Sequence, residues 1–314
     1  MPFTVSERPL IATAEAPSSV GNIATGFDIL GHTIEGPRDR VRVRRIAETV
    51  VRLGSVQGVV TDLPSDPARN TALRALDALR VARGLDFGFE VDMVKGIPLG
   101  SGMGGSAASA VAALVAANAL LEVPLRASEL YPMALEGEAA ASGGRHGDNV
   151  GPMLLGGLVL ATADRLIRLP VPKDLACVLV HPHFVLETRK AREALVQPYA
   201  ISDFVSQSAG LAQMMVGLFT GNPDSLRAGL RDVLVEPRRE HLIPGFREVK
   251  KAAMDEGAIG ASISGGGPSV FAWFEGRGAA ERSAPTMQRA FGRAGFDSDV
   301  FISTVDGPRA MVIG

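Results

Sequence analysis

The sequence predicts a mixed α+β fold in two domains. Its 314 residues are about twice the length of a common single domain. Short segments with the alternating pattern of a strand are mixed along the chain with longer segments that have the spacing of a helix. A proline-rich connection at residues 170–172 divides them, so we expect an N-terminal domain over residues 1–170 and a C-terminal domain over residues 171–314.

The elements of the first half follow from hydrophobic spacing. Residues 68–83 place three leucines at helical intervals, and residues 87–94 alternate apolar with polar side chains, as a half-exposed strand does. Ser128 is a candidate N-cap for a helix that continues to about residue 141. The other elements expected here are a strand at residues 41–44 and a helix at residues 106–121.

The second half places strands and helices around a group of glycines at residues 265–267. Its short apolar runs indicate strands, and its longer amphipathic runs indicate helices. The expected strands are residues 175–180, 258–263 and 269–274, and the expected helices are residues 206–219 and 243–256.

The composition argues against several classes of protein. Hydrophobic residues make up 46% and charged residues 21%, which is ordinary for a globular chain. With a net charge of −2, the sequence carries no strong signal for nucleic-acid binding, which depends on an excess of Lys and Arg. The longest apolar stretches, residues 107–121 and 150–163, are shorter than the roughly 20 residues of a membrane helix. We therefore expect neither a nucleic acid nor a membrane as partner.

The cellular compartment is predicted from two further features. Residues 1–10 lack the basic start and apolar core of a targeting segment. Cys177 is the only cysteine, so it forms no intrachain disulfide, and a reducing compartment is the default. We expect a cytoplasmic protein, and the sequence leaves open whether it forms a homodimer.

The first functional indication is a glycine-rich loop at residues 98–106. It follows the strand predicted at residues 87–94, precedes a predicted helix and contains four glycines. Glycines let backbone N–H groups crowd around an anion, and a helix N-terminus adds partial positive charge. A plain turn between strand and helix needs only one or two glycines. The loop therefore favours phosphate binding.

Two familiar phosphate loops fit less well. The Walker pattern needs Lys and then Ser or Thr after the last glycine, where this chain has Ser106 and Ala107. Gly100, Gly102 and Gly105 match the spacing of a dinucleotide-binding loop. However, the strand before that motif is normally apolar on both faces, whereas this one alternates.

Three ordered motifs resemble those of the GHMP small-molecule kinases. The loop and its continuation, residues 98–108, resemble the central motif of that family. Residues 16–28 are similar to its N-terminal motif, and residues 262–269 to its C-terminal glycine motif. Together the motifs span most of the chain, which is more specific than any single glycine loop.

Within this family the chain looks most like the homoserine kinases. The supporting segments are residues 22–37, residues 142–150 and the Glu-Pro-Arg-Arg run at residues 236–239. Mevalonate kinases and galactokinases carry an aspartate base where this sequence has Asn149. One departure is Gly105, at a position usually held by serine, which removes a hydroxyl but keeps the backbone N–H.

The resemblance implies a fold and a reaction. The expected N-terminal domain is like ribosomal protein S5 domain 2, the C-terminal domain is ferredoxin-like, and the site lies between them. The implied reaction is ATP-dependent phosphorylation of L-homoserine to O-phospho-L-homoserine, a step toward threonine, with Mg²⁺. The alternatives are a GHMP kinase for another small alcohol and an inactive nucleotide-binding relative.

The resemblance also implies residue roles on the nucleotide side. Ser106 and Glu138 are the implied Mg²⁺ ligands, although a helix cap and a solvated helix face are their ordinary interpretations. Asn70 is either a residue of the adenine pocket or a helix N-cap. The residues implied to hold the nucleotide phosphates are Pro98, Leu99, Gly100, Ser101, Gly102, Met103, Gly104, Gly105 and Ser106.

On the substrate side, Asn22 and Asp28 are implied to bind the ammonium group, although both are also common turn residues. A carboxylate calls for a guanidinium, and the family-matched positions are Arg192 and Arg239. An amide accepts no proton at neutral pH, so we expect Asn149 to act by positioning. The other implied residues are Thr188 and Gly266 on the substrate side, and His146 and Asp148, which either orient the site or act in acid–base catalysis.

Overall fold

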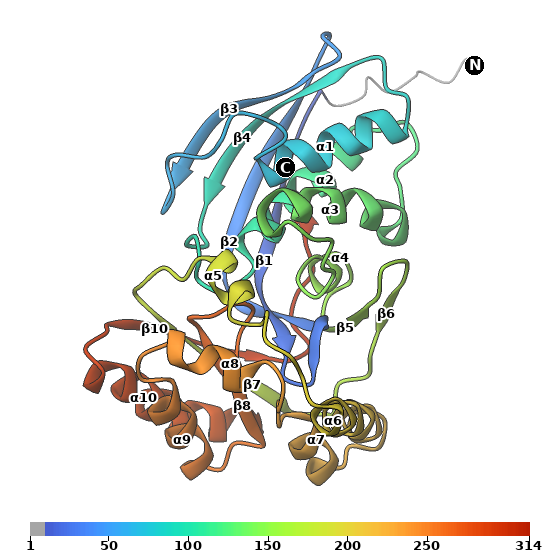
Figure 1. Cartoon of the computed structure of the whole chain (residues 1–314). Helices are drawn as coiled ribbons and strands as arrows, with labels where there is room; N and C mark the ends of the chain where they lie inside the picture. Colours follow the sequence, from blue (N-terminus) through green and yellow to red (C-terminus); the bar gives the residue numbers. More distant parts are fainter. Residues whose placement is uncertain (1–9) are drawn as a thin grey trace.

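The computed structural model describes residues 10–314, so the expectation about a targeting segment concerns residues outside this range apart from Leu10. Two long strands, β1 (Ile11–Ile23) and β2 (Gly26–Ile46), form a hairpin along the length of the molecule (Figure 1). The closed end of this hairpin contacts the second sheet, where the indole of Trp273 donates a hydrogen bond to His32. The hairpin therefore links the two halves.

The first sheet contains seven of the described strands, in the order β11-β1-β2-β4-β3, with β5 on β2 and β6 on β5. Its neighbours are antiparallel except for β3 and β4, which are parallel. Phe89, Val91 and Met93 of β4 are buried while Glu90 and Asp92 are half-buried, as the alternation predicts. The remaining strands are β3 (Val51–Gly58), β4 (Gly88–Lys95), β5 (Leu158–Ala161), β6 (Leu166–Arg168) and β11 (Met311–Val312).

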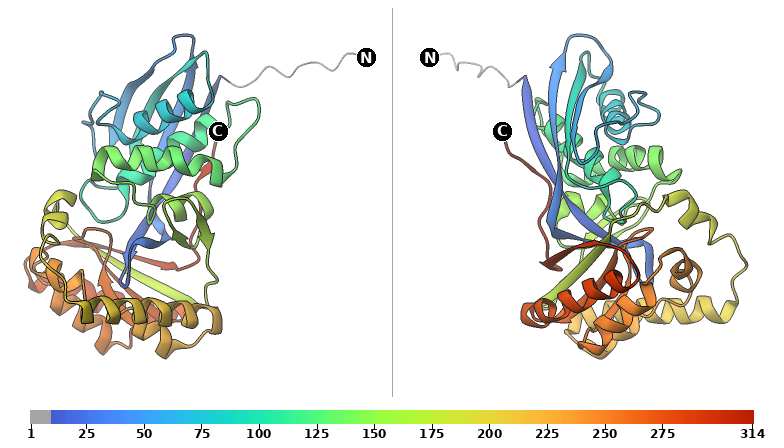
Figure 2. Two further views of the ribbon diagram at one scale, coloured as in Figure 1. Left: turned by 45° about the vertical axis from the view of Figure 1, so that its right-hand side comes forward. Right: turned by 90° about the vertical axis from the view of Figure 1, so that its left-hand side faces the viewer.

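Helices α1 to α3 lie together on one face of this sheet (Figure 2). The three leucines of α1, Leu73, Leu76 and Leu79, are fully buried, and Asn70 caps the helix. Half of the residues of helix α2 are alanine and most of the helix is buried, which allows close packing between the sheet and its neighbours. The bounds are α1 (Thr71–Ala82), α2 (Gly105–Asn118), α3 (Ala127–Ser142) and α4 (Val150–Leu155).

The second sheet has the strand order β10-β7-β9-β8, antiparallel throughout. Along the chain these strands and the helices between them form the β-α-β-β-α-β pattern of a ferredoxin-like domain. All eight residues of β7 are buried, which explains its uninterrupted apolar run. The bounds are β7 (Leu175–Pro182), α5 (Thr188–Glu193), α6 (Ile201–Thr220), α7 (Pro223–Gly229), α8 (Glu236–Arg239), η1 (Glu240–Leu242), α9 (Phe246–Asp255), β8 (Gly260–Ile263), β9 (Val270–Glu275), α10 (Arg277–Arg293) and β10 (Ser298–Thr304).

The predicted α+β class is confirmed, with differences at helix ends. Arg126, not Ser128, is the N-cap residue of α3, because the Glu129 carboxylate accepts a hydrogen bond from the Arg126 backbone N–H at 2.9 Å. Helix α9 begins three residues later than expected, since Gly245 has a φ of 85° and ends the preceding turn. No helix among residues 10–314 combines the length and apolarity needed to cross a bilayer.

Candidate active site

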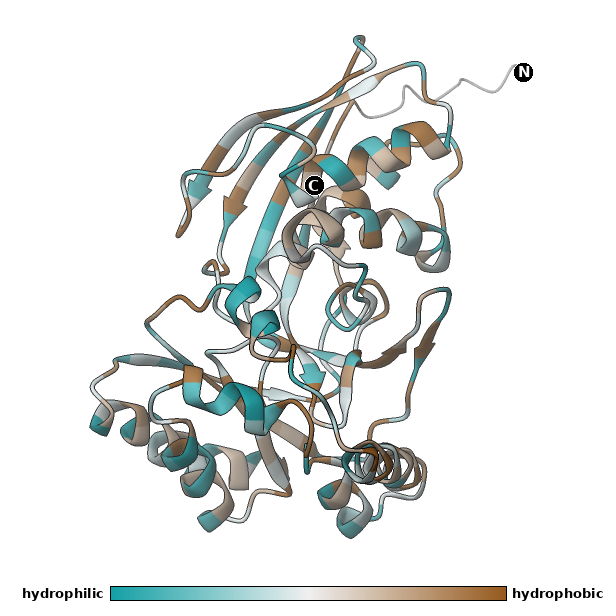
Figure 3. Cartoon of the chain, in the orientation of Figure 1, coloured by the Kyte–Doolittle hydropathy of each residue, from teal (hydrophilic) through white to brown (hydrophobic). Residues whose placement is uncertain are grey.

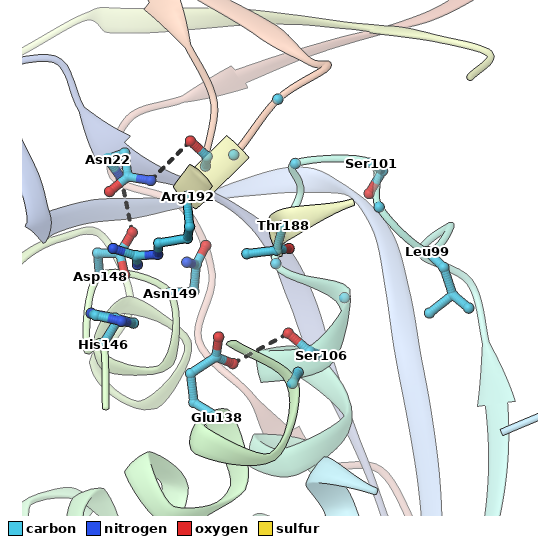
Figure 4. Close-up of a pocket in the computed structure, with 18 of the residues that line it drawn as sticks. Asn22, Leu99, Ser101, Ser106, Glu138, His146, Asp148, Asn149, Thr188 and Arg192 are labelled. Carbon is cyan, nitrogen blue, oxygen red and sulfur yellow. Dashed lines mark hydrogen bonds between the residues drawn. The ribbon is translucent and has the colours of Figure 1, made fainter. Parts of the chain in front are cut away.

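A cavity of about 200 Å³ lies where the hairpin, the glycine loop, α3 and the second sheet meet. Figure 4 shows its side chains converging from these elements. Residues from both glycine motifs line it and contact one another, so the site needs both halves of the chain. The sequence-derived candidates that line it are Asn22, Asp28, Pro98, Leu99, Gly100, Ser101, Gly102, Gly104, Gly105, Ser106, Glu138, His146, Asp148, Asn149, Thr188, Arg192 and Gly266.

The glycine loop is oriented by bonds to the second half of the chain. Three successive loop carbonyls, those of Gly100, Ser101 and Gly102, each accept a hydrogen bond. The donors are the Leu186 N–H at 3.1 Å, the Ser269 hydroxyl at 2.7 Å and the Ser264 hydroxyl at 2.7 Å. With the carbonyls held on that side, the loop presents backbone N–H groups toward the cavity and the start of α2.

A buried ion pair supports the loop from beneath. Lys95 and Asp39 are each 1% exposed and contact one another directly. The Lys95 ammonium also donates to the Gly105 carbonyl at 2.9 Å and the Ser109 hydroxyl at 2.8 Å. Burial lowers the pKa of Lys95, and the Asp39 charge opposes that shift. The pair therefore holds the first turn of α2 against the C-terminal end of β4.

Ser106 and Glu138 meet at one wall of the cavity (Figure 4). The Ser106 hydroxyl donates to the Glu138 carboxylate at 3.2 Å, and the glutamate side chain is buried. Mg²⁺ prefers oxygen ligands and takes only one or two carboxylates from a protein. A hydroxyl and a carboxylate beside a phosphate loop fit that preference, so these residues are suited to the metal.

The opposite wall is charged. Arg192 donates two parallel hydrogen bonds to Asp28, at 2.8 and 2.7 Å. His146 lies 3.3 Å from the same carboxylate, and burial lowers the pKa of its imidazole despite the nearby Asp28 charge. Asn22 and Asp28 both have left-handed backbone, with φ of 55° and 62°. Such strain in non-glycine residues is found mainly at functional sites.

Asp148 is buried behind this wall. Its carboxylate accepts a hydrogen bond from the Asn22 N–H at 2.9 Å. Burial raises the pKa of Asp148 to about 7, and the negative charge of Asp28 acts in the same direction. Gly31 allows this arrangement, because a Cβ there would lie 1.7 Å from the Asp148 carbonyl oxygen. The turn that carries Asp148 can therefore lie directly against β2.

Asn149 follows at the start of α4. The Ser19 hydroxyl donates to its side-chain oxygen at 2.8 Å. Because that oxygen is already an acceptor, the amide NH₂ is the part of Asn149 left to act toward the cavity. The partner Ser19 belongs to the N-terminal motif but was not among the predicted site residues.

Three predicted residues do not line this cavity. Met103 is buried beneath the loop. Asn70 accepts from two N–H groups of α1, which makes it an N-cap, and it also lines an adjoining cavity of about 220 Å³ shared with Leu99 and Ser106. Arg239 is 1% exposed, and its Nε donates to the Ala191 carbonyl at 2.8 Å, next to Arg192. It therefore lies behind the charged wall.

Other contributors were missed because nothing local marks them. Ser264 and Ser269 flank the second glycine group, but their role depends on the carbonyls of a loop far away in the sequence. Lys95 and Asp39 are charged residues on strands, where exposure is the usual expectation. Phe27 follows a glycine, and its ring lies beneath two guanidinium groups. The Cζ atoms of Arg192 and Arg239 are 5.3 and 5.1 Å from the ring centre.

Comparison with known proteins places the chain in a family. The model for the GHMP kinases N terminal domain matches residues 70–157, and that for GHMP kinases C terminal matches residues 214–293. The homoserine kinase of Xanthomonas campestris pv. campestris is 55% identical, with 96% of this chain and 94% of the relative covered. The homoserine kinase of Chlorobaculum tepidum is 41% identical, with 96% and 98% covered.

A solved structure agrees with these relatives. The crystal structure of homoserine kinase from Cytophaga hutchinsonii superposes with a TM-score of 0.93 at 38% identity, and each chain is covered completely. The site, both family models and full-length relatives all lead to the same group, and the chain belongs to the homoserine kinases of the GHMP kinase family.

Proposed function

We propose that this enzyme transfers the γ-phosphoryl group of ATP to the hydroxyl of L-homoserine, giving O-phospho-L-homoserine for threonine synthesis. One observation carries the assignment. A single cavity joins a phosphate-binding loop to a carboxylate and a guanidinium, Asp28 and Arg192, which match the two charged ends of a free amino acid. A neutral sugar or a hydroxy acid would match this pair of opposite charges less well.

The nucleotide side works mainly through backbone groups. The N–H groups of residues 100–106 and the N-terminus of α2 cradle the phosphates of ATP. Ser106 and Glu138 would hold Mg²⁺, which would neutralise charge that develops on the transferring phosphoryl group. Asn70 and the adjoining cavity accept the base, since that cavity opens beside the loop at Leu99.

The substrate side fixes the orientation of homoserine. Asp28, with Asn22 beside it, binds the ammonium group, and Arg192 binds the carboxylate in a bidentate manner. Arg239 supports Arg192 through the Ala191 carbonyl. Thr188 and Gly266 close the same side of the cavity.

Catalysis rests on positioning and charge stabilisation. Because Ser19 occupies the Asn149 side-chain oxygen, the amide NH₂ donates toward the reacting oxygens. His146 and Asp148 orient this region, and the proton of the hydroxyl passes to the phosphate itself. Holding the two reactants in line supplies most of the acceleration.

The direct test measures ADP release by the purified protein with Mg²⁺ and a panel of alcohols. L-Homoserine should be turned over rapidly, and mevalonate, galactose and shikimate should give little ADP. Equal or better turnover of one of those alcohols would replace the homoserine assignment. No turnover with any alcohol would support an inactive nucleotide-binding relative.

Four further parts of the assignment are proposals. We place a domain boundary near residue 170, and we place the protein in the cytoplasm because its single cysteine can form no intrachain disulfide. We also propose a homodimer and no nucleic-acid partner. In support of a dimer, helix α6 is strongly apolar (Figure 3) and leaves Ile201, Phe204 and Phe219 at least 59% exposed. Light scattering on the purified protein tests the oligomeric state.

A further inference from the structure

Asp28 and Arg192 already pair with one another in the cavity that receives the substrate. Both guanidinium NH groups of Arg192 donate to the two oxygens of Asp28, at 2.8 and 2.7 Å, and both residues line the cavity. The Arg192 and Asp28 side chains are 30% and 22% exposed, so neither charge is fully solvated. This bidentate pair has the geometry that a substrate carboxylate would adopt on the same guanidinium.

The surrounding structure holds both partners in place. Asp28 has a φ of 62°, and its N–H donates to the Asn22 side-chain oxygen at 2.8 Å. Arg192 lies on the short helix α5, where Arg239 fixes the preceding carbonyl, and its guanidinium lies 5.3 Å from the Phe27 ring centre. Asp28 also lies 3.3 Å from His146, but burial lowers the pKa of that imidazole and so disfavours its charged form. The two charges therefore have little freedom to find other charged partners when their contact opens.

We propose that L-homoserine binds by exchanging ion pairs, so that its carboxylate replaces Asp28 on Arg192 while its ammonium replaces Arg192 on Asp28. The inference rests on the proposed function. Two ion pairs replace one internal pair, and no charge is left alone. An alcohol with only one charge opens the internal pair and leaves one partly buried charge unpaired.

The exchange makes the two charge contacts interdependent. A ligand must supply both opposite charges at once, because partly buried charges are stable only when paired. The internal pair thus selects zwitterions over hydroxy acids and amino alcohols. If the contacts were independent, each analogue would simply lose the affinity of its missing group.

Two analogues separate these possibilities. 4-Hydroxybutyrate lacks the ammonium of homoserine, and 3-amino-1-propanol lacks the carboxylate. Their affinities, with that of L-homoserine, are measured by calorimetry at pH 8, where the lowered pKa of His146 keeps its imidazole neutral beside Asp28. The variants are Asp28→Asn and Arg192→Gln. Asparagine tolerates left-handed backbone, so the first variant keeps the local conformation.

The proposed exchange predicts that each variant binds one of the two analogues more tightly than the wild type does. Asp28→Asn frees Arg192 from its internal competitor, so 4-hydroxybutyrate should bind about tenfold tighter than to the wild type, while homoserine binds at least about tenfold weaker. Arg192→Gln should bind 3-amino-1-propanol more tightly than the wild type does, by a similar factor. Its affinity for 4-hydroxybutyrate should not rise. Asp306→Asn removes a carboxylate paired with Arg168 at 2.6 Å on the surface and should change none of these affinities.

The proposed exchange can be contradicted by the same affinity measurements. If each analogue binds its matching variant no tighter than the wild type, the internal pair does not compete with substrate and the exchange is wrong. The two variants test it independently, so failure of one to fold leaves the other. If the wild type instead fails to turn over or bind homoserine, the proposed function itself fails.

Discussion

The two sides of the cavity are built from different chemical groups. On the nucleotide side, backbone N–H groups of one continuous loop face the ligand, and serine hydroxyls from the other half of the chain hold the loop carbonyls. On the substrate side, titratable side chains from β2, α5 and the turn before α4 lie together, beside the Asn22 amide of β1. Recognition of phosphate needs many equivalent donors, whereas recognition of an amino acid needs two opposite charges at a set separation.

The difference suggests how each side responds to substitution. A backbone site is sensitive to any change that shifts the loop, even where no functional group is lost. A side-chain site is sensitive to loss of individual charges and carries the free-energy cost of burying them. The following four predictions test this contrast, from the largest expected effect to the smallest.

Loss of the proposed metal ligand Glu138 should have the largest effect, because it removes a side-chain function from a side of the cavity that is otherwise built from backbone groups. Glu138→Gln should lower kcat by about 100-fold or more and raise the Mg²⁺ concentration needed for half-maximal rate. Ser106→Ala should do the same to a smaller extent. Steady-state rates over a Mg²⁺ titration provide the measurement. If the rate of Glu138→Gln depends on Mg²⁺ concentration as the wild-type rate does, Glu138 has a purely structural role.

Distortion of the loop should weaken nucleotide binding alone. Gly102 has a φ of 76°, and a Cβ there would lie 2.5 Å from the Ser264 carbonyl oxygen. Gly102→Ala should therefore raise the KM for ATP by about tenfold or more while the KM for homoserine changes by about twofold or less. The matched control is Gly143→Ala, whose φ of 71° is similarly left-handed but whose Cβ would meet no atom within 4 Å. Equal effects of both variants would mean that backbone strain, and not the loop contact, is responsible.

Removal of Arg239 should affect the substrate side selectively. Arg239→Ala should raise the KM for homoserine by about tenfold or less. The lost hydrogen bond contributes about 1.5–3 kcal/mol, but it holds the Ala191 carbonyl and reaches the substrate only through Arg192. The KM for ATP should move by about twofold or less. Arg238→Ala is the control, because Arg238 donates to the Leu234 and Pro198 carbonyls and contacts no part of the cavity. If only Arg238→Ala raises the KM for homoserine, then Arg238, and not Arg239, is the arginine that supports substrate binding.

The smallest effect concerns the stability cost of a buried carboxyl. Burial raises the pKa of Asp148 from 3.8 to about 7, so the folded protein holds this proton more tightly than the unfolded chain does. Ionisation then destabilises the fold increasingly as the pH rises from about 4 to about 7, and fully above that. Asp148→Asn should therefore raise Tm by a few degrees more at pH 8 than at pH 5. Thermal unfolding at the two pH values checks this, and an equal change at both would contradict the raised pKa.

The sequence predicted the nucleotide side better than the substrate side. Residues 98–106 are contiguous, and four glycines before a helix indicate phosphate binding without any knowledge of the fold. Asp28 and Arg192 are 164 positions apart, and their pairing follows only from the packing of α5 against the hairpin. Family resemblance named both residues, but it did not reveal that they contact one another.

Arg239 shows a second limit of the sequence. Its motif indicates a role in binding the substrate, yet the side chain lies behind the cavity wall and donates to the Ala191 carbonyl. Whether a side chain touches a ligand or supports one that does depends on which neighbour lies between them. Asn70 is similar, because its helix-capping role is local and predictable, whereas its place on an adjoining cavity depends on the packing of α1 beside the loop.

The α+β class, five of the ten described α-helices, five of the eleven described strands and the family followed from the sequence alone, because each depends on spacing or motifs within short segments. The tertiary structure decided which distant groups meet. It placed Ser264 and Ser269 on the loop carbonyls, Lys95 against Asp39, and Asp28 against Arg192. Short-range patterns reflect local backbone geometry, whereas these contacts exist only after distant segments pack. Lys95 meets Asp39 when β4 pairs with β2 in the first sheet, and the other contacts form when the two halves of the chain come together.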